Sequence, residues 1–311
     1  MLELRRLRLL HALAGYGTVN AAAEALHLTG PAVSQQLATL EREVGVPLVQ
    51  RQGRRLVLTD AGRLLVAHTD VLLDQLAAAE ASVLALRNEV AGTVRLGAFS
   101  SATATLVATA WRSLAAEHGA GLVLRLTELE PEESLVALNR GELDLAVAHS
   151  YDLLPLALPA GCERHELLTD PVVAALPEDD PVARDSAPVA LGALAERPWL
   201  SVPSVTSCHQ MLQRACGAAG FVPRVIAQTS EYGPVLALVA AGAGVTLLPR
   251  LGVPVVPEGV ALRPLARPVN RHVFAVTRRG GGRHPAHRAV LDHLTRAAAD
   301  RQRHDHGQPA D

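Results

Sequence analysis

Hydrophobic positions along the first sixty residues recur at the spacing expected of short helices. Apolar residues return every three or four positions, and turns that contain glycine or a polar residue interrupt them. A short stretch around a central glycine then alternates in the manner of a hairpin. The pattern therefore predicts three helices and a hairpin, at residues 2–13, 19–26, 30–44 and 46–62.

The turn between the second and third predicted helices identifies the kind of unit. Thr18 and Thr29 stand directly before the two helices, where a hydroxyl can accept a hydrogen bond from a free backbone N–H. Pro31 falls in the first turn of the third helix, where its missing N–H costs little. Two short helices joined by such a turn form a helix-turn-helix, and the following hairpin makes it winged.

The third predicted helix separates apolar from polar residues. Val33, Leu37 and Leu40 form its apolar stripe, whereas Ser34 and Gln35 lie on another face. Ser and Gln side chains can hydrogen-bond to base edges in the major groove, so this helix is the candidate recognition helix. The alternative is a small structural bundle whose polar face meets only water.

Charge gives modest support for a nucleic-acid partner. The whole chain has a net charge of -2, and all 29 of its Lys and Arg positions are arginine. Residues 1–63 hold eight arginines and five acidic residues, which is a mild basic excess. Arg51 and Arg54 fall on the predicted wing, where they can contact phosphates.

A long helix is predicted after the hairpin. Residues 59–90 contain no proline and one glycine, near the start. Two interleaved series recur there every seven positions, as in a coiled coil: Leu65, Leu72, Ala79 and Leu86, and Thr69, Leu76, Val83 and Val90. This seam predicts pairing with the same helix of a second subunit, and the alternative is packing on the helix's own domain.

Strand and helix patterns alternate beyond residue 90. The first five elements are predicted as strand, helix, strand, helix and strand, which indicates an open sheet with helices on its faces. The alternation continues with separate strands expected at residues 163–170 and 171–178, and with a last helix at 285–301. Residues 304–311 are expected to be a disordered tail.

Composition narrows the class of protein. Hydrophobic residues make up 49% of the chain, yet no stretch approaches the ~18 apolar residues of a membrane span. Three cysteines without a CxxC pair, and an N-terminus without a signal-like cleavage site, favour a cytoplasmic location. We find no GxSxG, HExxH, P-loop or strand-linked GxGxxG motif, so we predict no catalytic residues, no metal site and no cofactor.

The motifs together resemble those of LysR-type transcriptional regulators over nearly the whole chain. The segment at residues 18–62, TVNAAAEALHLTGPAVSQQLATLEREVGVPLVQRQGRRLVLTDAG, carries the most specific part of the resemblance. Three looser segments follow in the family order: VRLGAFSSATATLVATAW, ELEPEESLVALNRGELDLAVAH and GFVPRVIAQTSEYGPVLALVAAGAGVTLLP.

The resemblance implies a domain organisation and a set of partners. It places a winged helix-turn-helix at residues 1–58, a dimerising linker helix at 59–90 and an effector-binding domain at 91–303. That domain is expected to have two α/β lobes like a periplasmic binding protein, lobe one at 91–163 and 268–300, lobe two at 164–267. The implied partners are double-stranded promoter DNA, a small-molecule effector in the cleft between the lobes, and further copies of the chain in a dimer or tetramer.

The resemblance also assigns DNA contacts to the turn, the third helix and the wing: Thr18, Asn20, Thr29, Pro31, Ser34, Gln35, Arg51 and Arg54. Two positions depart from the family pattern. Gly30 stands where a glutamine usually reaches a base, so base readout is expected to fall on Thr29, Ser34 and Gln35. Asn20 replaces the more common Ser, Thr or basic residue and can still bond a phosphate.

The candidate effector residues begin where the first strand of the α/β region gives way to a helix. Ser100, Ser101 and Thr103 lie there, and hydroxyls and free N–H groups at a helix start suit an anionic group such as a carboxylate. Ordinary N-capping is the alternative, and it requires only one of the three. The resemblance places the effector here and adds five residues that follow strands or precede a helix: His149, Ser150, Thr206, Ser207 and Ser230.

Two other interpretations stay open on the sequence. A solute-binding protein for transport would explain the α/β lobes but not residues 1–60. A thiol-based redox sensor, as in peroxide-sensing relatives, would use Cys208 and Cys216. Eight residues of helix separate two cysteines by roughly 12 Å, whereas a disulfide needs Cα atoms within about 7 Å.

Overall fold

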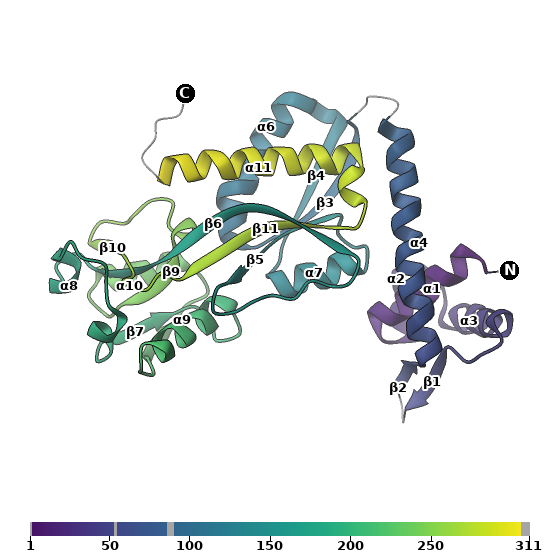
Figure 1. Ribbon diagram of the computed structural model, residues 1–311, viewed down its shortest axis with the longest axis horizontal. Helices are drawn as coiled ribbons and strands as arrows, with labels where there is room; N and C mark the ends of the chain where they lie inside the picture. The colour runs from purple at the N-terminus through teal and green to yellow at the C-terminus, as the bar shows by residue number, and fades with distance from the viewer. Residues whose placement is uncertain (1, 53–54, 86–89, 306–311) are drawn as a thin grey trace.

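The computed structural model describes residues 2–52, 55–85 and 90–305, and three parts follow one another along the chain. A small helical domain with a hairpin comes first, a long helix second and a two-lobed α/β domain third (Figure 1). The long helix packs beside the small domain at one end of the molecule, and the lobes extend away from both. This is the fold class predicted from the sequence.

The N-terminal domain consists of three helices and a two-stranded hairpin: α1 (Leu4–Tyr16), α2 (Val19–Ala25), α3 (Gly30–Val44), β1 (Val49–Gln52) and β2 (Arg55–Leu58). Their apolar faces meet in one core, in which Leu10, Leu40 and Leu48 have no exposed surface. Full burial of a leucine contributes roughly 1.5–3 kcal/mol. These three leucines come from α1, from α3 and from the segment before β1, so the core fixes the hairpin against the helices.

The linker helix α4 (Asp60–Ala85) starts directly against the hairpin. Gly62 permits this approach, because a Cβ atom at that position would overlap the carbonyl oxygen of Leu48. Farther along, Oδ1 of Asp70 on α4 lies 2.9 Å from Nε2 of His11 on α1. The linker helix is therefore joined to the small domain over its first half.

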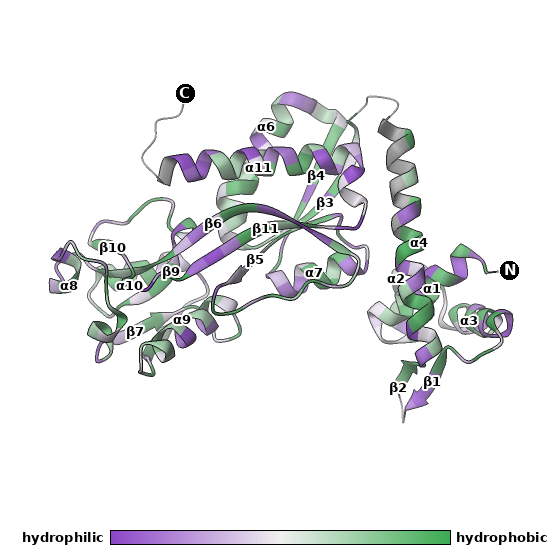
Figure 2. Cartoon of the chain, in the orientation of Figure 1, coloured by the Kyte–Doolittle hydropathy of each residue, from purple (hydrophilic) through white to green (hydrophobic). Residues whose placement is uncertain are grey.

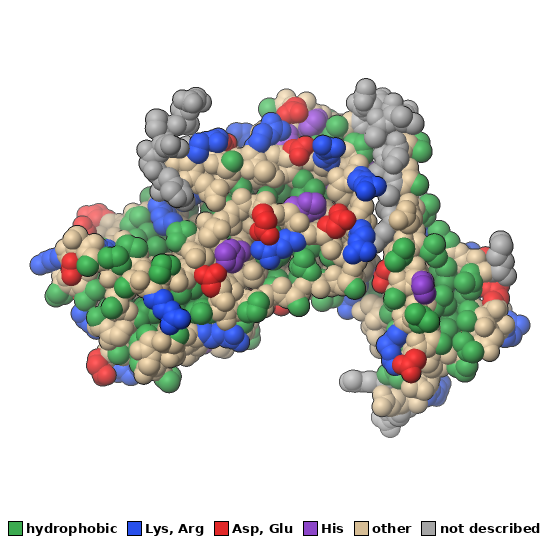
Figure 3. Space-filling view, in the orientation of Figure 1, with side chains coloured by type: hydrophobic (Ala, Val, Ile, Leu, Met, Phe, Trp, Pro, Cys, Tyr) green, Lys and Arg blue, Asp and Glu red, His purple; other side chains and the backbone are tan. Residues whose placement is uncertain are grey.

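Part of the predicted heptad seam faces the chain's own N-terminal domain. Leu65 packs against that core, and Thr69 is completely buried. Among the described residues, the large apolar side chains that α4 leaves exposed form a stripe that shares Leu72 and Val83 with the predicted seam and adds Leu64 and Val71. Figure 3 shows hydrophobic side chains gathered over this end of the molecule. The exposed stripe therefore overlaps the predicted seam only in part, because α4 also covers the domain before it; Leu86 lies outside the described residues.

The first lobe begins with the predicted strand-helix-strand-helix-strand order. Its elements are β3 (Gly92–Ala98), α5 (Ser100–Ala102), a π-helical turn (Thr103–Val107), α6 (Ala108–His118), the 3-10 turn η2 (Gly119–Gly121), β4 (Leu122–Glu128), α7 (Pro131–Asn139) and β5 (Leu145–Tyr151). β3 lies between β4 and β5 and pairs in parallel with both. The parallel βαβαβ arrangement predicted from the sequence is therefore present.

Two long strands connect the lobes. β6 (Cys162–Pro177) is continuous where the sequence predicts two strands, and β11 (Asn270–Arg278) runs antiparallel to its first half. The second half of β6 pairs with β9 (Thr246–Pro249) and β10 (Val260–Pro264). The order along the sheet is β10-β6-β11-β5-β3-β4, with β9 also on β6. The lobes thus share one mixed sheet and meet where β6 changes partners.

The second lobe packs around a separate core. Its other elements are α8 (Pro181–Arg184), η3 (Leu191–Leu194), β7 (Pro198–Ser201), α9 (Ser207–Ala218), β8 (Arg224–Gln228), α10 (Tyr232–Ala240) and η4 (Arg250–Gly252). Trp199, Met211 and Val239 have no exposed surface, and they bring β7, α9 and α10 together. Residues 198–201 and 224–228 form a small parallel sheet of their own.

The chain returns to lobe one in its last helix. After η5 (Gly281–Arg283), α11 (Pro285–Asp305) packs along α6 and buries Val290, Leu294 and Ala298. Hydrophobic and hydrophilic residues alternate along α11 in Figure 2, as expected of a helix with one face on a core. Among the described residues, no helix is both long enough and apolar enough to cross a membrane.

Candidate DNA-binding surface and effector cleft

Threonine hydroxyls begin both helices of the helix-turn-helix. Thr18 accepts a hydrogen bond from the N–H of Ala21 at 3.2 Å, and Thr29 accepts one from the N–H of Ala32 at 3.4 Å. Such caps satisfy N–H groups that a helix start leaves free. Both threonines are exposed. Their caps fix the starts of α2 and α3 on the surface that is predicted to meet DNA.

A groove between α2, α3 and the hairpin collects several of the predicted DNA contacts. Four of them line it: Thr18, Asn20, Ser34 and Arg51. Pro31 and Gln35 are exposed on the first turns of α3. This arrangement can present a hydroxyl and an amide to base edges and an arginine to the phosphates. Arg54, the second predicted wing residue, lies outside the described residues.

Gly30 and Asn20, the two residues that depart from the family pattern, lie next to each other. A Cβ atom at Gly30 would lie 3.1 Å from Oδ1 of Asn20, which is tighter than most real Cβ contacts. A longer side chain at position 30 would therefore push Asn20 aside. The glycine at the start of α3 and the asparagine on α2 therefore fit each other.

Glu41, the acidic residue that lines the groove, binds the backbone at the start of the wing. One carboxylate oxygen of Glu41 accepts hydrogen bonds from the N–H groups of Leu48 and Val49, at 2.8 and 3.2 Å. On the same helix, Glu43 pairs with Arg6 of α1 at 2.7 Å. These carboxylates position β1 and α1 against the recognition helix, so their negative charge is engaged within the domain.

A buried ion pair lies where the long strands pass between the lobes. Arg271 donates from Nε and Nη2 to Oδ2 of Asp170, at 3.0 and 2.7 Å, and the two side chains are 1% and 3% exposed. Oδ1 of Asp170 accepts from the N–H of Leu251 in η4 at 2.9 Å, and Nη2 of Arg271 also donates to Oγ of Ser101 at 3.0 Å. The pair ties α5, β6, β11 and η4 together.

A second polar contact spans the two lobes. His149, near the end of β5, and Ser207, the first residue of α9, lie 2.9 Å apart between Nε2 and Oγ, and both are buried. The imidazole also meets the rings of Phe99 and Tyr151 edge-on, at centroid distances of 4.5 and 5.3 Å. The two lobes therefore contact each other directly at this point.

Three buried polar atoms of these elements have no hydrogen-bond partner among the described residues, and Oη of Tyr151 is one of them. Within the part of the chain that the structure describes, Oγ1 of Thr103 and Nδ1 of His149 are buried without a hydrogen-bond partner. Leaving a buried polar atom unpaired costs about 1–3 kcal/mol. A ligand that bonded to these atoms would recover part of that energy.

The buried contacts where the lobes meet include one charge pair and one neutral imidazole. Burial, with a smaller contribution from Arg271, holds the pKa of His149 well below its ordinary value, so the ring is neutral at neutral pH. Burial alone would lower the pKa of Arg271, but Asp170 beside it raises that pKa above its ordinary value. Burial also raises the pKa of the Cys208 thiol, which stays protonated.

The other predicted effector residues take different places. Ser100 and Ser230 are exposed, and Thr206 is the N-cap of α9. Ser150 is buried, but alternation along β5 directs it to the face opposite His149. Three of the predicted residues take part in the polar contacts: His149 and Ser207 contact each other between the lobes, and Ser101 accepts from Arg271. Thr103 follows Ser101 in the same helical segment.

Sequence reasoning missed Asp170 and Arg271, the most buried charges of the cleft. A signal was available, because each charge adjoins an apolar strand segment, PVVAAL after Asp170 and HVFAV after Arg271. A charged residue in such a setting is buried only with a partner. The sequence could not show that the two partners are each other, because 101 positions separate them.

The effector domain touches the N-terminal domain at the C-terminal end of α7. Nε of Arg140 donates to the carbonyl oxygen of Gly15 at 3.0 Å, and its guanidinium lies 4.8 Å from the centroid of the Tyr16 ring. The Tyr16 hydroxyl donates to Glu142 at 2.7 Å, and burial together with Glu142 raises the pKa of Tyr16 to about 12. A cavity of about 380 Å³ lies beside these contacts, with α4 residues such as Leu76 in its wall.

Two family models match this chain. The bacterial regulatory helix-turn-helix protein, lysR family, matches residues 4–63, and the LysR substrate binding domain matches residues 87–299. The chain belongs to the LysR family of transcriptional regulators. LysR regulators bind DNA, and they take an effector in the substrate-binding domain.

Similar proteins cover nearly the whole chain. A RuBisCO operon transcriptional regulator of Allochromatium vinosum is 29% identical over 303 residues, which is 96% of this LysR-family chain and 97% of the relative. A probable hydrogen peroxide-inducible genes activator of Mycobacterium avium is 31% identical, with 86% of each chain covered. The structure of a full-length OxyR variant from Pseudomonas aeruginosa has a TM-score of 0.68 at 23% identity, over 94% of this chain and 95% of that one.

Proposed function

We propose that this LysR-family regulator reads promoter DNA through α3 and the wing as a cytoplasmic homo-oligomer, and that it is not an enzyme. Ser34 and Gln35 are exposed on α3, and Arg51 lies across the same groove, so base and phosphate contacts can form together. The exposed apolar stripe on α4, centred on Val71 and Leu72, supports pairing with a second copy. Two copies would set two recognition helices against two half-sites.

The effector is a small molecule with a carboxylate or similar anionic group, bound between the lobes. The observation that carries this proposal is the buried Arg271 beside Ser101 and Asp170, directly under the contact of His149 with Ser207. Asp170 and Ser101 use Nε and Nη2 of the guanidinium, so Nη1 is the part that can meet an acceptor on a ligand.

The buried atoms of Thr103 and His149 that lack hydrogen-bond partners can bind the same anionic ligand. Oγ1 of Thr103 can donate to a carboxylate oxygen, and the start of α5 adds N–H groups that favour negative charge. The neutral His149 ring can bond a hydroxyl or carbonyl of the ligand through Nδ1. Entry of the ligand parts His149 from Ser207, so occupancy of the cleft and the spacing of the lobes are coupled.

The helix α7 supplies a route from the cleft to the DNA-binding domain. It starts after β4, whose C-terminal end lies at the cleft edge of the parallel strands. It ends at Asn139, directly before Arg140, which contacts Gly15 and Tyr16 of α1. A helix moves as a rigid rod when its buried side chains keep their packing. A shift of lobe one would therefore change the position of the N-terminal domain, which is the differential contact that allosteric control requires.

The effector part is tested by binding. DNA fragments selected by the full-length protein identify its target genes, and a panel of small carboxylates suggested by those genes is then titrated by calorimetry. Ser101→Ala and Thr103→Val each remove a hydroxyl, and hydrogen bonds to charged groups contribute ~1.5–3 kcal/mol, so the pair should weaken affinity at least about tenfold. Ser204→Ala, an exposed serine of lobe two, is the control and should bind as wild type. Unchanged affinity in the double variant would place the effector elsewhere.

The coupling part needs a separate readout. Arg140→Ala removes the hydrogen bond to Gly15 and the contact with the Tyr16 ring, but it leaves the cleft and α3 intact. We expect unchanged effector affinity in the absence of DNA, and a smaller effect of the effector on DNA affinity. Arg125→Ala, an exposed arginine on β4, is the control. Full effector response in Arg140→Ala would mean that the signal does not pass through α7.

A further inference from the structure

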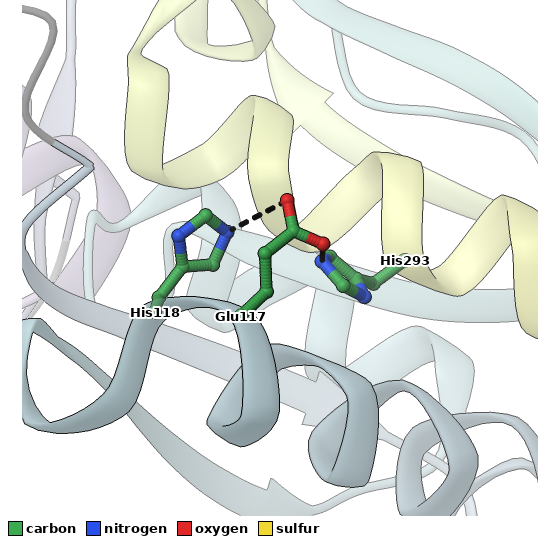
Figure 4. A group of neighbouring side chains, drawn as sticks. All are labelled: Glu117, His118 and His293. Carbon is green, nitrogen blue, oxygen red and sulfur yellow. Dashed lines mark ion pairs between the residues drawn. The ribbon is translucent and has the colours of Figure 1, made fainter.

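Three side chains of lobe one meet away from both the cleft and the DNA-binding surface. Glu117 and His118 are the last residues of α6, and His293 lies in the middle of α11. Their ligand atoms all lie within 4.8 Å of one another. Figure 4 shows the Glu117 carboxylate between the two imidazole rings, with one oxygen directed to each. Two helices that pack side by side thus bring two nitrogens and a carboxylate together.

The spacing of these atoms is close to that of metal ligands. Nε2 of His293 lies 3.3 Å from Oε2 of Glu117, and Nε2 of His118 lies 3.7 Å from Oε1. Ligands about 2.0–2.2 Å from a tetrahedral Zn²⁺ are separated from each other by about 3.3–3.6 Å. Glu117 is exposed, so its carboxylate can rotate toward either nitrogen.

His293 is held in the tautomer that a metal requires. Oγ of Ser113 lies 2.6 Å from Nδ1 of His293 and donates its own proton to the carbonyl oxygen of Ala110 at 3.0 Å. Nη2 of Arg296 can only donate to Nε2 of His293, at 2.8 Å, so Nδ1 carries the ring proton and donates it to Oγ of Ser113. Metal-ligating histidines are oriented in this way by a bond from their other nitrogen.

The second imidazole has an unused nitrogen aimed at the same place. Nε2 of His118 is buried and has no hydrogen-bond partner among the described residues. The side chain is only 15% exposed, and its ring meets that of His293 edge-on at 5.8 Å between centroids. A buried nitrogen without a hydrogen bond is costly unless something binds it. Nε2 of His118 is therefore available to a ligand, whereas Nε2 of His293 is already in contact with Arg296.

A positive group already contacts two members of this cluster. Nη2 of Arg296 lies 2.8 Å from Nε2 of His293 and 3.4 Å from Oε2 of Glu117. The side chain is 59% exposed, so it can turn into solvent without loss of core packing. The position of the guanidinium indicates where positive charge is favoured. The guanidinium would also compete with a metal ion for the lone pair on Nε2 of His293.

We propose that Glu117, His118 and His293 form a binding site for one divalent transition-metal ion of the Zn²⁺ type. Two imidazoles and one carboxylate suit Zn²⁺ and its neighbours, whereas Mg²⁺ and Ca²⁺ prefer oxygen ligands alone. Glu117 is 53% exposed, so the remaining coordination position opens to solvent. The bound ion joins the end of α6 to the middle of α11 when Arg296 swings away.

The test is a titration of the full-length protein with Zn²⁺ against a chromogenic chelator, with Mg²⁺ as a second probe. His118→Gln removes one ligand at a surface-proximal position and should lower the affinity of the tightest site by at least about tenfold. His284→Gln is the matched control, because His284 also stands beside another histidine, stacking on His287 at 4.5 Å, but outside this cluster. Equal Zn²⁺ affinities in the wild type and His118→Gln, or an equal fall in both variants, would overturn the proposal.

A gain-of-affinity variant gives an independent check that loss of folding cannot mimic. Arg296→Gln removes the competing charge and should raise Zn²⁺ affinity by about fivefold or more. Co²⁺ bound to this variant should show the visible absorption of a four-coordinate site, and the added substitution His118→Gln should abolish it. Unchanged Zn²⁺ affinity in Arg296→Gln would show that the guanidinium does not stand in the metal's place, and the site would be rejected.

Discussion

The buried pair of Arg271 and Asp170 makes a sharp prediction for Asp170→Asn. The side chains are 1% and 3% exposed, and two hydrogen bonds join them at 3.0 and 2.7 Å. Asparagine can still accept the bond from the N–H of Leu251 through its carbonyl oxygen. Its NH₂ group must then face the donors of Arg271, so a buried positive charge is left opposite another donor.

Removal of one member of a buried ion pair costs about 3–5 kcal/mol, because the other charge stays desolvated. In a domain of 150–250 residues each kcal/mol lowers the melting temperature by about 2–4 °C, so the effector domain should melt about 6–20 °C lower. The assay is urea and thermal unfolding of the full-length protein. Glu166→Gln, which breaks the exposed pair with Arg164, is the control and should cost less than about 1 kcal/mol.

The double variant with Arg271→Met separates the cost of an unpaired charge from the loss of packing. Replacement of both members by groups without charge should recover a large part of the stability lost in Asp170→Asn. A loss of less than about 1 kcal/mol in the single variant, or no recovery in the double variant, would refute the idea that this charge pair holds the lobes together.

Three further predictions concern assembly, redox state and pH. Val71→Asp with Leu72→Asp places charges on the exposed stripe of α4 and should give monomers in sedimentation; an unchanged oligomer would exclude this face as the interface. Hydrogen peroxide should leave DNA affinity unchanged, because burial raises the pKa of Cys208 and keeps its thiol protonated; a loss of affinity that Cys208→Ala prevents would contradict this. His149 is neutral when folded and has a lowered pKa, so unfolding takes up a proton below its ordinary pKa of 6.5. Stability should therefore fall between about pH 7 and about pH 5 in the wild type more than in His149→Gln, and equal slopes would show that His149 is not the titrating group.

The N-terminal domain could be predicted from the sequence because its signals are local. Helical spacing, the threonines at positions 18 and 29 and the proline at position 31 each act within one turn of the residue concerned. The βαβαβ order of lobe one is equally local. Such patterns determine the type and order of elements before any long-range contact is known.

The connections between the lobes could not be predicted in the same way. Asp170 and Pro171 look like a turn between two strands, yet β6 continues through them because its partner changes there from β11 to β9 and β10. A proline is tolerated where the hydrogen-bonded ladder changes partners. β10 was not predicted at all, since Pro257 and Pro264 bracket it and suggest a loop.

The heptad seam and the cleft show what pattern alone leaves out. Spacing of seven residues identifies one side of α4, but it does not show that Leu65 and Thr69 already cover the preceding domain. The hydroxyls at the start of α5 could be predicted as a group, whereas the ion pair beneath them depends on residues 101 positions apart. Non-local pairs of this kind become visible only in the folded chain.

The most direct test of the central claim compares specific and random DNA. The full-length protein first selects genomic fragments, and the affinities of wild type, Gln35→Ala and Arg51→Ala are then measured on the best fragment and on random DNA at several salt concentrations. Gln35 is exposed on α3, so its loss should cost about 1–3 kcal/mol on the selected fragment and little on random DNA. Arg51→Ala should weaken both and reduce the salt dependence. Equal losses on both DNAs in Gln35→Ala would show that α3 does not read bases, and would contradict the account.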